Sequence, residues 1–160
     1  MFIQTNPVPW SDLRFAVIQD LVTAGQARHH GDMPAPTITV TAAILEKDGL
    51  VFAARRGPGK HLAGYWEFPG GKLESDETPE QCLARELQEE FGIQINVGPF
   101  MGESTYDYGH KVVRLLAYRV VLLAGEIELR DHDQMMWLSK HELHDLKWAP
   151  ADVPLLALIV

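Results

Sequence analysis

The chain contains a single cysteine, Cys82, so no disulfide can form within it. Such a chain suits a reducing compartment, and Cys82 is best explained as a small buried apolar residue rather than a reactive thiol. No apolar run approaches the roughly 20 residues that cross a bilayer. The first residues lack the basic start and unbroken apolar run of a signal peptide. We therefore expect a cytoplasmic protein with no membrane partner.

Basic residues are also scarce. Lys and Arg number 14 against 22 Asp and Glu, which gives a formal net charge of −8. A surface that binds nucleic acid would need clustered Lys and Arg to neutralise phosphates, so nucleic acid is not an expected partner. An anionic small molecule would be repelled by this charge unless divalent cations lay between it and the protein.

A length of 160 residues fits one ordinary domain. Residues 1–36 differ from the rest, because apolar positions recur at helical spacing up to a terminating Gly25, and a segment with proline and glycine follows. We predict an N-terminal helical extension and linker over 1–36 and a single domain over 37–160.

Within that domain, short apolar and β-branched runs alternate with turn signals and a few helical patterns. Strands are predicted at 37–45, 50–54, 94–97, 101–106, 112–122 and 135–138. Helices are predicted at 79–91, at 139–146 after a Ser-x-x-Glu capping pattern, and at 152–160. Strands with interspersed helices and hairpin-length turns indicate an α+β fold rather than a doubly wound parallel sheet.

The most informative segment runs from residue 71 to residue 93. Thr78, Pro79 and Gln81 form a helix start, and Gly92 should end the helix. Glu86, Glu89 and Glu90 then share one helix face, because residues three and four apart are neighbours there. Each like-charged pair costs about 0.2 to 0.5 kcal/mol. Bound Mg²⁺ or Mn²⁺ would reverse that cost, since hard cations take carboxylate oxygens.

The fixed positions of this segment resemble the Nudix box of the Nudix hydrolases. They are Gly71, Glu77, Arg85, Glu86, Leu87, Glu89, Glu90, Gly92 and Ile93. The resemblance implies a mixed sheet sandwiched between helices and hydrolysis of a pyrophosphate bond. It further implies that Glu86, Glu89, Glu90 and the carbonyl of Gly70 hold the metal, that Arg85 orients the carboxylates, and that Glu77 is a structural or outer group.

The resemblance leaves two candidates for the base that takes a proton from water. Glu89 is the first choice. Asp131 is the alternative outside the box, because it lies six residues before Trp137, and MutT-like relatives carry an acidic residue at a comparable offset from the strand that contains the tryptophan.

Three segments outside the box, 53–56, 62–71 and 148–154, resemble the MutT-like branch, in particular CTP or modified-dCTP pyrophosphohydrolases and 8-oxo-dGTP diphosphatases. A nucleoside triphosphate is then the implied substrate, cleaved to a monophosphate and pyrophosphate. Arg56 and Lys72 are assigned to its phosphates, whereas Arg55 is equally well explained as a solvated arginine at a strand end.

The base of the nucleotide is assigned to aromatic and acidic residues. Phe68 is a candidate stacking wall, with Tyr106 or Tyr108 as alternatives. Asp152 could accept hydrogen bonds from a cytosine amino group or from the N–H edge of guanine, or it could cap the last helix.

Other functions remain open at this point. The same box could serve hydrolysis of ADP-ribose, NADH or dinucleoside polyphosphates, or the fold could be a non-catalytic binding module. Non-catalytic modules typically lose one or more box carboxylates, and Glu86, Glu89 and Glu90 are all present. We expect a monomer.

Overall fold

The structure is a computed structural model that describes residues 33–60 and 62–159. The predicted N-terminal helix and most of the predicted linker lie outside the described residues. The elements are β1 Thr37–Lys47, β2 Leu50–Arg56, β3 Trp66–Glu67, α2 Pro79–Phe91, β4 Gln94–Asp107, β5 Val112–Ala124, β6 His132–Leu138 and the 3₁₀ helices η1 Glu142–Asp145 and η2 Val153–Leu158.

The strands form one mixed sheet. Its order is β3-β2-β1-β5-β4, and β6 pairs with β2. The strands β1 and β5 are parallel over nine residue pairs, from Thr37 opposite Val112 to Leu45 opposite Val120, while the other pairings are antiparallel. This combination of parallel and antiparallel pairs confirms the predicted α+β fold.

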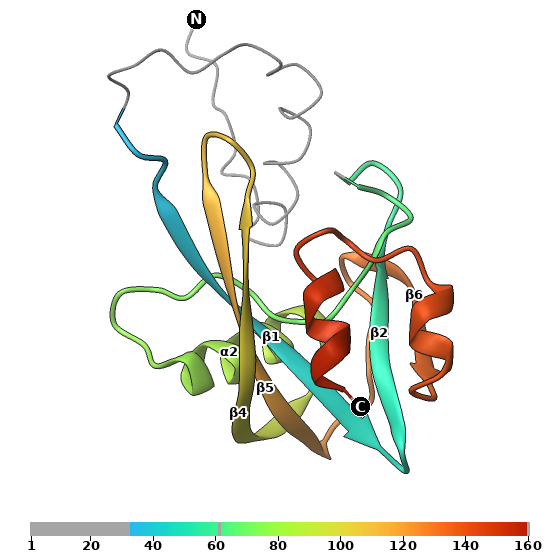
Figure 1. Ribbon diagram of the computed structural model, residues 1–160. Coiled ribbons are helices and arrows are strands. Elements are labelled where there is room, and N and C mark those ends of the chain that lie inside the picture. The colour runs from blue at the N-terminus through green and yellow to red at the C-terminus, as the bar shows by residue number, and fades with distance from the viewer. Residues whose placement is uncertain (1–32, 61, 160) are drawn as a thin grey trace, which may run out of the picture.

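The central strand β1 separates two apolar clusters, because its side chains alternate between the faces of the sheet. Ala43 and Leu45 pack with Phe52 and with the apolar face of α2. Val40, Ala42 and Ile44 pack on the opposite side with a cluster that includes Trp148 of the C-terminal segment and Leu155 of η2. Figure 1 shows α2 beside β1 and β5, and the C-terminal turns close to β2.

Several predicted elements differ in detail from the observed ones. The segments 94–97 and 101–106 belong to one strand, β4, whose pairing with β5 shifts register between Val97 and Phe100 and between Phe100 and Gly102. The two-residue strand β3 was missed, because its Trp66–Glu67 segment is too short to show a periodicity.

The last two predicted helices are 3₁₀ helices rather than α-helices. In η1, the Glu142 carboxylate accepts a hydrogen bond from the Ser139 N–H at 2.8 Å, which is half of the predicted capping box. The structure assigns His141 as the N-cap of η1, and it makes no side-chain cap bond. The backbone bonds of these turns span three residues, as from the Leu155 N–H to the Asp152 carbonyl at 2.9 Å, which is the 3₁₀ pattern.

Candidate metal and nucleotide site

The helix α2 has the predicted bounds, set by local capping. The Thr78 hydroxyl accepts from the Gln81 N–H at 3.2 Å, and the Gln81 side chain accepts from the Thr78 N–H at 2.9 Å. At the other end Gly92 has φ 68°, and its N–H bonds to the Gln88 and Leu87 carbonyls. A left-handed conformation there favours glycine. These caps fix where the acidic face of the helix begins and ends.

The three carboxylates of α2 have different environments. Glu86 and Glu90 are buried, at 3% and 6% exposure, whereas Glu89 is exposed. Burial raises the pKa of Glu86 above its ordinary value, and the neighbouring Arg85 opposes that rise. A buried carboxylate that must ionise favours a nearby cation.

Arg85 hydrogen-bonds to three acidic side chains of the box. Its guanidinium donates twice to Glu77, from Nη2 to Oε1 at 2.7 Å and from Nε to Oε2 at 3.0 Å. Its Nη1 donates to Glu86 Oε1 at 2.9 Å and to Glu89 Oε2 at 3.3 Å. The hydrogen bonds from Arg85 lower the pKa of Glu77 to about 2, so Glu77 stays ionised.

The Gly70–Gly71 loop lies against both β1 and α2. A Cβ at Gly70 would overlap the Thr41 carbonyl oxygen, and a Cβ at Gly71 would overlap the Glu86 carboxylate. Glycine at position 70 therefore allows the loop to approach the β1 backbone this closely, whereas a side chain at position 71 would displace the Glu86 carboxylate. The loop and the Glu86 carboxylate are thereby brought into contact.

The chemistry of these donors fits a hard divalent cation, which takes carboxylate and carbonyl oxygens. In this conformation no three His, Cys, Asp or Glu side chains of residues 33–60 and 62–159 are gathered closely enough to hold a metal ion. Arg85 instead holds Glu86 and Glu89 by hydrogen bonds. Metal binding would thus require these two carboxylates to turn from Arg85 toward the cation.

Asp131 lies in the connection between β5 and β6. Its Oδ1 is 3.6 Å from Lys60 Nζ. The neighbouring Arg130 donates from Nη1 to the Glu89 carbonyl at 2.6 Å and to the Gln88 carbonyl at 3.3 Å. Arg130 thus ties the chain next to Asp131 to the C-terminal turn of the box helix, where a positive charge is favourable.

Asp152 and Phe68 are joined directly. Asp152 is 1% exposed, and its Oδ1 accepts a hydrogen bond from the Phe68 N–H at 3.1 Å. The structure shows no side-chain cap bond from Asp152 to η2, so the capping alternative is wrong. The carboxylate turns to a backbone N–H 84 residues earlier in the chain instead. The Phe68 ring is fully buried and lies 4.5 Å from the Trp148 ring, centroid to centroid. A stacking role would need one face of the ring to open.

The arginines at the end of β2 have different surroundings. Arg56 is fully buried. Arg55 makes two hydrogen bonds to Asp133, at 2.9 and 2.8 Å, so it is not simply solvated. Arg56 also interacts with another residue of the protein, so both arginine side chains already have partners within the chain.

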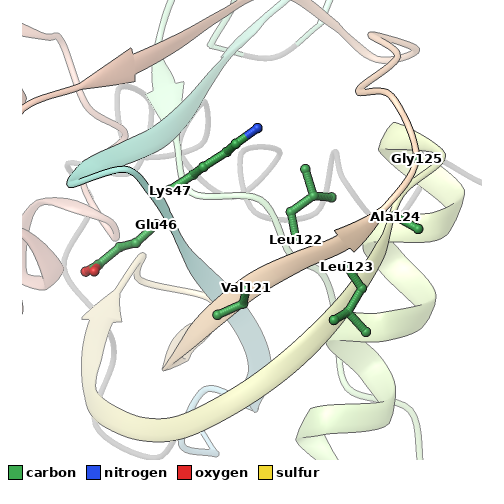
Figure 2. Close-up of a pocket in the computed structure, with 7 residues that line it drawn as sticks. All are labelled: Glu46, Lys47, Val121, Leu122, Leu123, Ala124 and Gly125. Carbon is green, nitrogen blue, oxygen red and sulfur yellow. The ribbon is translucent and has the colours of Figure 1, made fainter.

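Two hollows of the surface differ in their relation to these residues. One, of about 800 Å³, is lined by residues on β1 and on the loop before α2: Thr37, Ile38, Thr39, Lys72, Leu73, Glu74, Ser75 and Glu77. Its size is that of a small-molecule site, and it contains the candidate Lys72. The other, of about 250 Å³, is lined by Glu46, Lys47 and residues 121–125 (Figure 2). It contains no candidate residue.

Sequence reasoning missed a buried hydrogen-bonded pair beside the box helix. His132 Nε2 lies 2.7 Å from Glu67 Oε1, and both side chains are buried. The His132 ring also stacks on Phe91, the last residue of α2, with centroids 5.1 Å apart. Neither residue lies in a predicted strand, because Trp66–Glu67 was missed and the predicted strand 135–138 begins after His132. No sequence signal therefore shows that the two residues meet.

A NUDIX domain model matches residues 35–159, and the chain therefore belongs to the Nudix family. It is 40% identical over 119 residues to the CTP pyrophosphohydrolase of Escherichia coli (strain K12), covering 74% of this chain and 88% of that protein. It is 33% identical over 125 residues to the 8-oxo-dGTP diphosphatase of Haemophilus influenzae, covering 78% and 92%. The E. coli ORF135 protein, solved in solution, superposes with a TM-score of 0.72 at 37% identity, over 80% of this chain and 92% of that one.

These comparisons confirm the Nudix family and its α+β fold. Members of this family hydrolyse phosphoric anhydrides and generally need a divalent metal. Among the helices of the described residues, none is long and apolar enough to cross a membrane.

Proposed function

We propose that this protein is a Mg²⁺- or Mn²⁺-dependent nucleoside triphosphate pyrophosphohydrolase that converts a nucleoside triphosphate and water to a monophosphate and pyrophosphate. The observation that carries the proposal is the buried Glu86 carboxylate pressed against Gly71, with Glu89 and Glu90 on the same side of α2. Relatives at 40% and 33% identity carry the names CTP pyrophosphohydrolase and 8-oxo-dGTP diphosphatase. They support triphosphates as the substrate class.

In this proposal the metal site consists of Glu86, Glu89, Glu90 and the carbonyl of Gly70. A bound divalent cation would neutralise phosphate charge and make water a better nucleophile. Glu89 is the proposed base because it is exposed and only weakly held by Arg85, at 3.3 Å. Asp131 is the second candidate, since Arg130 anchors its loop to the same turn of α2.

Substrate contacts are proposed for the phosphates and for the base of the nucleotide. Lys72 lines the larger hollow and is assigned to phosphate, together with Arg56. Asp152 is assigned to the N–H groups of the base, because an ionised carboxylate only accepts hydrogen bonds. Phe68 is assigned to the neighbouring wall, since its N–H binds Asp152 directly. Cytosine and oxidised guanine both offer N–H groups that suit Asp152.

The test is turnover of a panel with Mg²⁺ at low substrate, so that kcat/KM values can be compared. The panel contains CTP, dCTP, 5-methyl-dCTP, dGTP, 8-oxo-dGTP, ADP-ribose and NADH. Monophosphate and pyrophosphate in equal amounts are expected from one of the triphosphates. Release of orthophosphate alone, or turnover without any divalent metal, would refute the proposal. Faster turnover of ADP-ribose or NADH would move the protein to another substrate class.

Glu89→Gln should lower kcat about 10²- to 10⁴-fold, the usual contribution of a positioned base. Glu80→Gln is the matched control, because Glu80 is an exposed glutamate in the first turn of the same helix. A Glu89→Gln enzyme that keeps its kcat would point to Asp131 as the base. Asp131→Asn should then lower kcat instead.

Three further assignments remain part of the proposal. They are the division into an extension over 1–36 and a domain over 37–160, a monomeric state and a cytoplasmic location. Light scattering on the full chain tests the monomer, and deletion of residues 1–32 tests whether the Nudix domain folds and turns over alone.

A further inference from the structure

Thr41 is a polar residue in an apolar row. Together with Ala43 and Leu45 it lies on the face of β1 that looks toward α2, since alternate residues of a strand share a face. Its side chain is fully buried, at 0% exposure. A buried hydroxyl costs free energy unless it is hydrogen-bonded, so its partner is informative.

That partner is the carbonyl of Gly71. The Thr41 N–H donates to the Gly71 oxygen at 2.8 Å, and the Thr41 hydroxyl donates to the same oxygen at 3.1 Å. The Cys82 thiol lies 3.3 Å from the hydroxyl, 3.5 Å from the Gly71 oxygen and 3.3 Å from the Lys72 oxygen. Two residues from β1 and α2 therefore converge on one peptide of the glycine loop.

The loop runs antiparallel to β1 and forms an isolated bridge with it between Lys72 and Val40. The Ala43 N–H donates to the Pro69 carbonyl at 2.7 Å, and the Thr41 N–H donates to the Gly71 carbonyl at 2.8 Å. Successive carbonyls of an extended chain point to opposite edges. With the carbonyls of Pro69 and Gly71 directed at β1, the carbonyl of Gly70 between them is directed away from β1.

We propose that Thr41 is a positioning residue for the metal site. By holding the Gly71 carbonyl from a second direction, its hydroxyl keeps the preceding peptide from tilting and so fixes the direction of the Gly70 carbonyl. The inference rests on the proposed function, in which the Gly70 carbonyl is a metal ligand. Cys82 assists by packing against the Thr41 hydroxyl and the same peptide.

The decisive variant is Thr41→Val, which keeps the shape of the side chain and removes the hydroxyl. Mn²⁺ binding to the full-length protein without nucleotide is measured from the electron paramagnetic resonance signal of free Mn²⁺. Loss of a group that orients a ligand typically weakens metal binding about 10- to 100-fold, and we expect about 10-fold here. Thr41→Ser should restore most of the affinity. Thr105→Val is the matched control, because Thr105 is exposed on β4.

A second readout separates positioning from simple stability. In the Mg²⁺ dependence of turnover, Thr41→Val should raise the Mg²⁺ concentration needed for half-maximal rate by about the same factor of 10. The kcat at saturating Mg²⁺ should change far less, because excess metal compensates for a weakened site. Amide exchange at Gly71 and Lys72 should be faster in Thr41→Val than in Thr41→Ser.

Unchanged Mn²⁺ affinity in a folded Thr41→Val protein would overturn the inference, whatever its melting temperature. If Thr41→Val does not fold, Thr41→Ala replaces it, since alanine also removes the hydroxyl. Wild-type affinity in Thr41→Ala would overturn the inference equally. A wild-type protein that binds no Mn²⁺ and releases no pyrophosphate would refute the proposed function, and the inference with it. Normal wild-type activity with an unaffected variant refutes the inference alone.

Discussion

The ion pair between Glu77 and Arg85 should make the stability of this protein depend on pH in the acid range. Two hydrogen bonds from Arg85 lower the pKa of Glu77 from its ordinary value of 4.5 to about 2. A carboxyl whose pKa is lowered by folding stabilises the protein above its unfolded pKa. That stabilisation is lost as the pH falls from about 4.5 toward 2.

The size of the effect follows from the same pKa. A lowering from 4.5 to about 2 corresponds to about 3 kcal/mol as an upper limit. Arg85 is 26% exposed, so water screens the pair. We therefore expect about 1 to 2 kcal/mol at pH 7 after this discount. Linkage leaves less than half of the effect at about pH 3 and almost none at about pH 2.

The assay compares Glu77→Gln with the wild type by urea unfolding of the metal-free protein at pH 7 and pH 3. The variant should be less stable at pH 7, and the difference in unfolding free energy should fall to less than half at pH 3, because Glu77 of the unfolded chain is then protonated and neutral like Gln. Glu74→Gln is the control, since Glu74 is 54% exposed and 3.9 Å from Arg85. An equal difference between variant and wild type at both pH values would refute the assignment of the pKa to the Arg85 pair.

Two other substitutions test the energetic roles of buried polar side chains. Glu86→Gln should raise the melting temperature of the metal-free protein at pH 7, because burial raises the pKa of Glu86 and its ionisation costs stability as the pH rises. The variant should also lose the rise in melting temperature that Mn²⁺ gives the wild type. A melting temperature below that of the metal-free wild type would contradict the first expectation. His132→Phe removes the hydrogen bond between His132 and Glu67 and should cost about 2 kcal/mol of unfolding free energy, whereas adding Glu67→Gln should recover part of the loss. Calorimetry and a double-mutant cycle measure these effects, and strict additivity in the cycle would show that the pair does not interact.

The parts of the site that sequence reasoning predicted are those fixed by local chemistry. The bounds of α2 follow from Thr78, Gln81 and Gly92, which act within one turn of the helix. The common face of Glu86 and Glu90 follows from helical periodicity alone. Such features need no knowledge of the rest of the fold.

The parts that it did not predict depend on residues far apart in the chain. Thr41 and Gly71 are separated by 30 positions, and Glu67 and His132 by 65. The capping role considered for Asp152 was wrong because a partner 84 positions away binds its carboxylate. A residue of this kind has several local uses, and only the tertiary fold selects among them.

The two faces of β1 have a consequence for substitutions along this strand. Residues 41, 43 and 45 face the helix that carries the acidic cluster, while Val40, Ala42 and Ile44 pack in the cluster that contains Phe68 and Trp148. A side-chain change at an even position therefore acts first on the surroundings of the proposed base contacts, and a change at an odd position acts first on the helix with the acidic cluster. One strand thus carries two sets of packing constraints, one for each part of the proposed site.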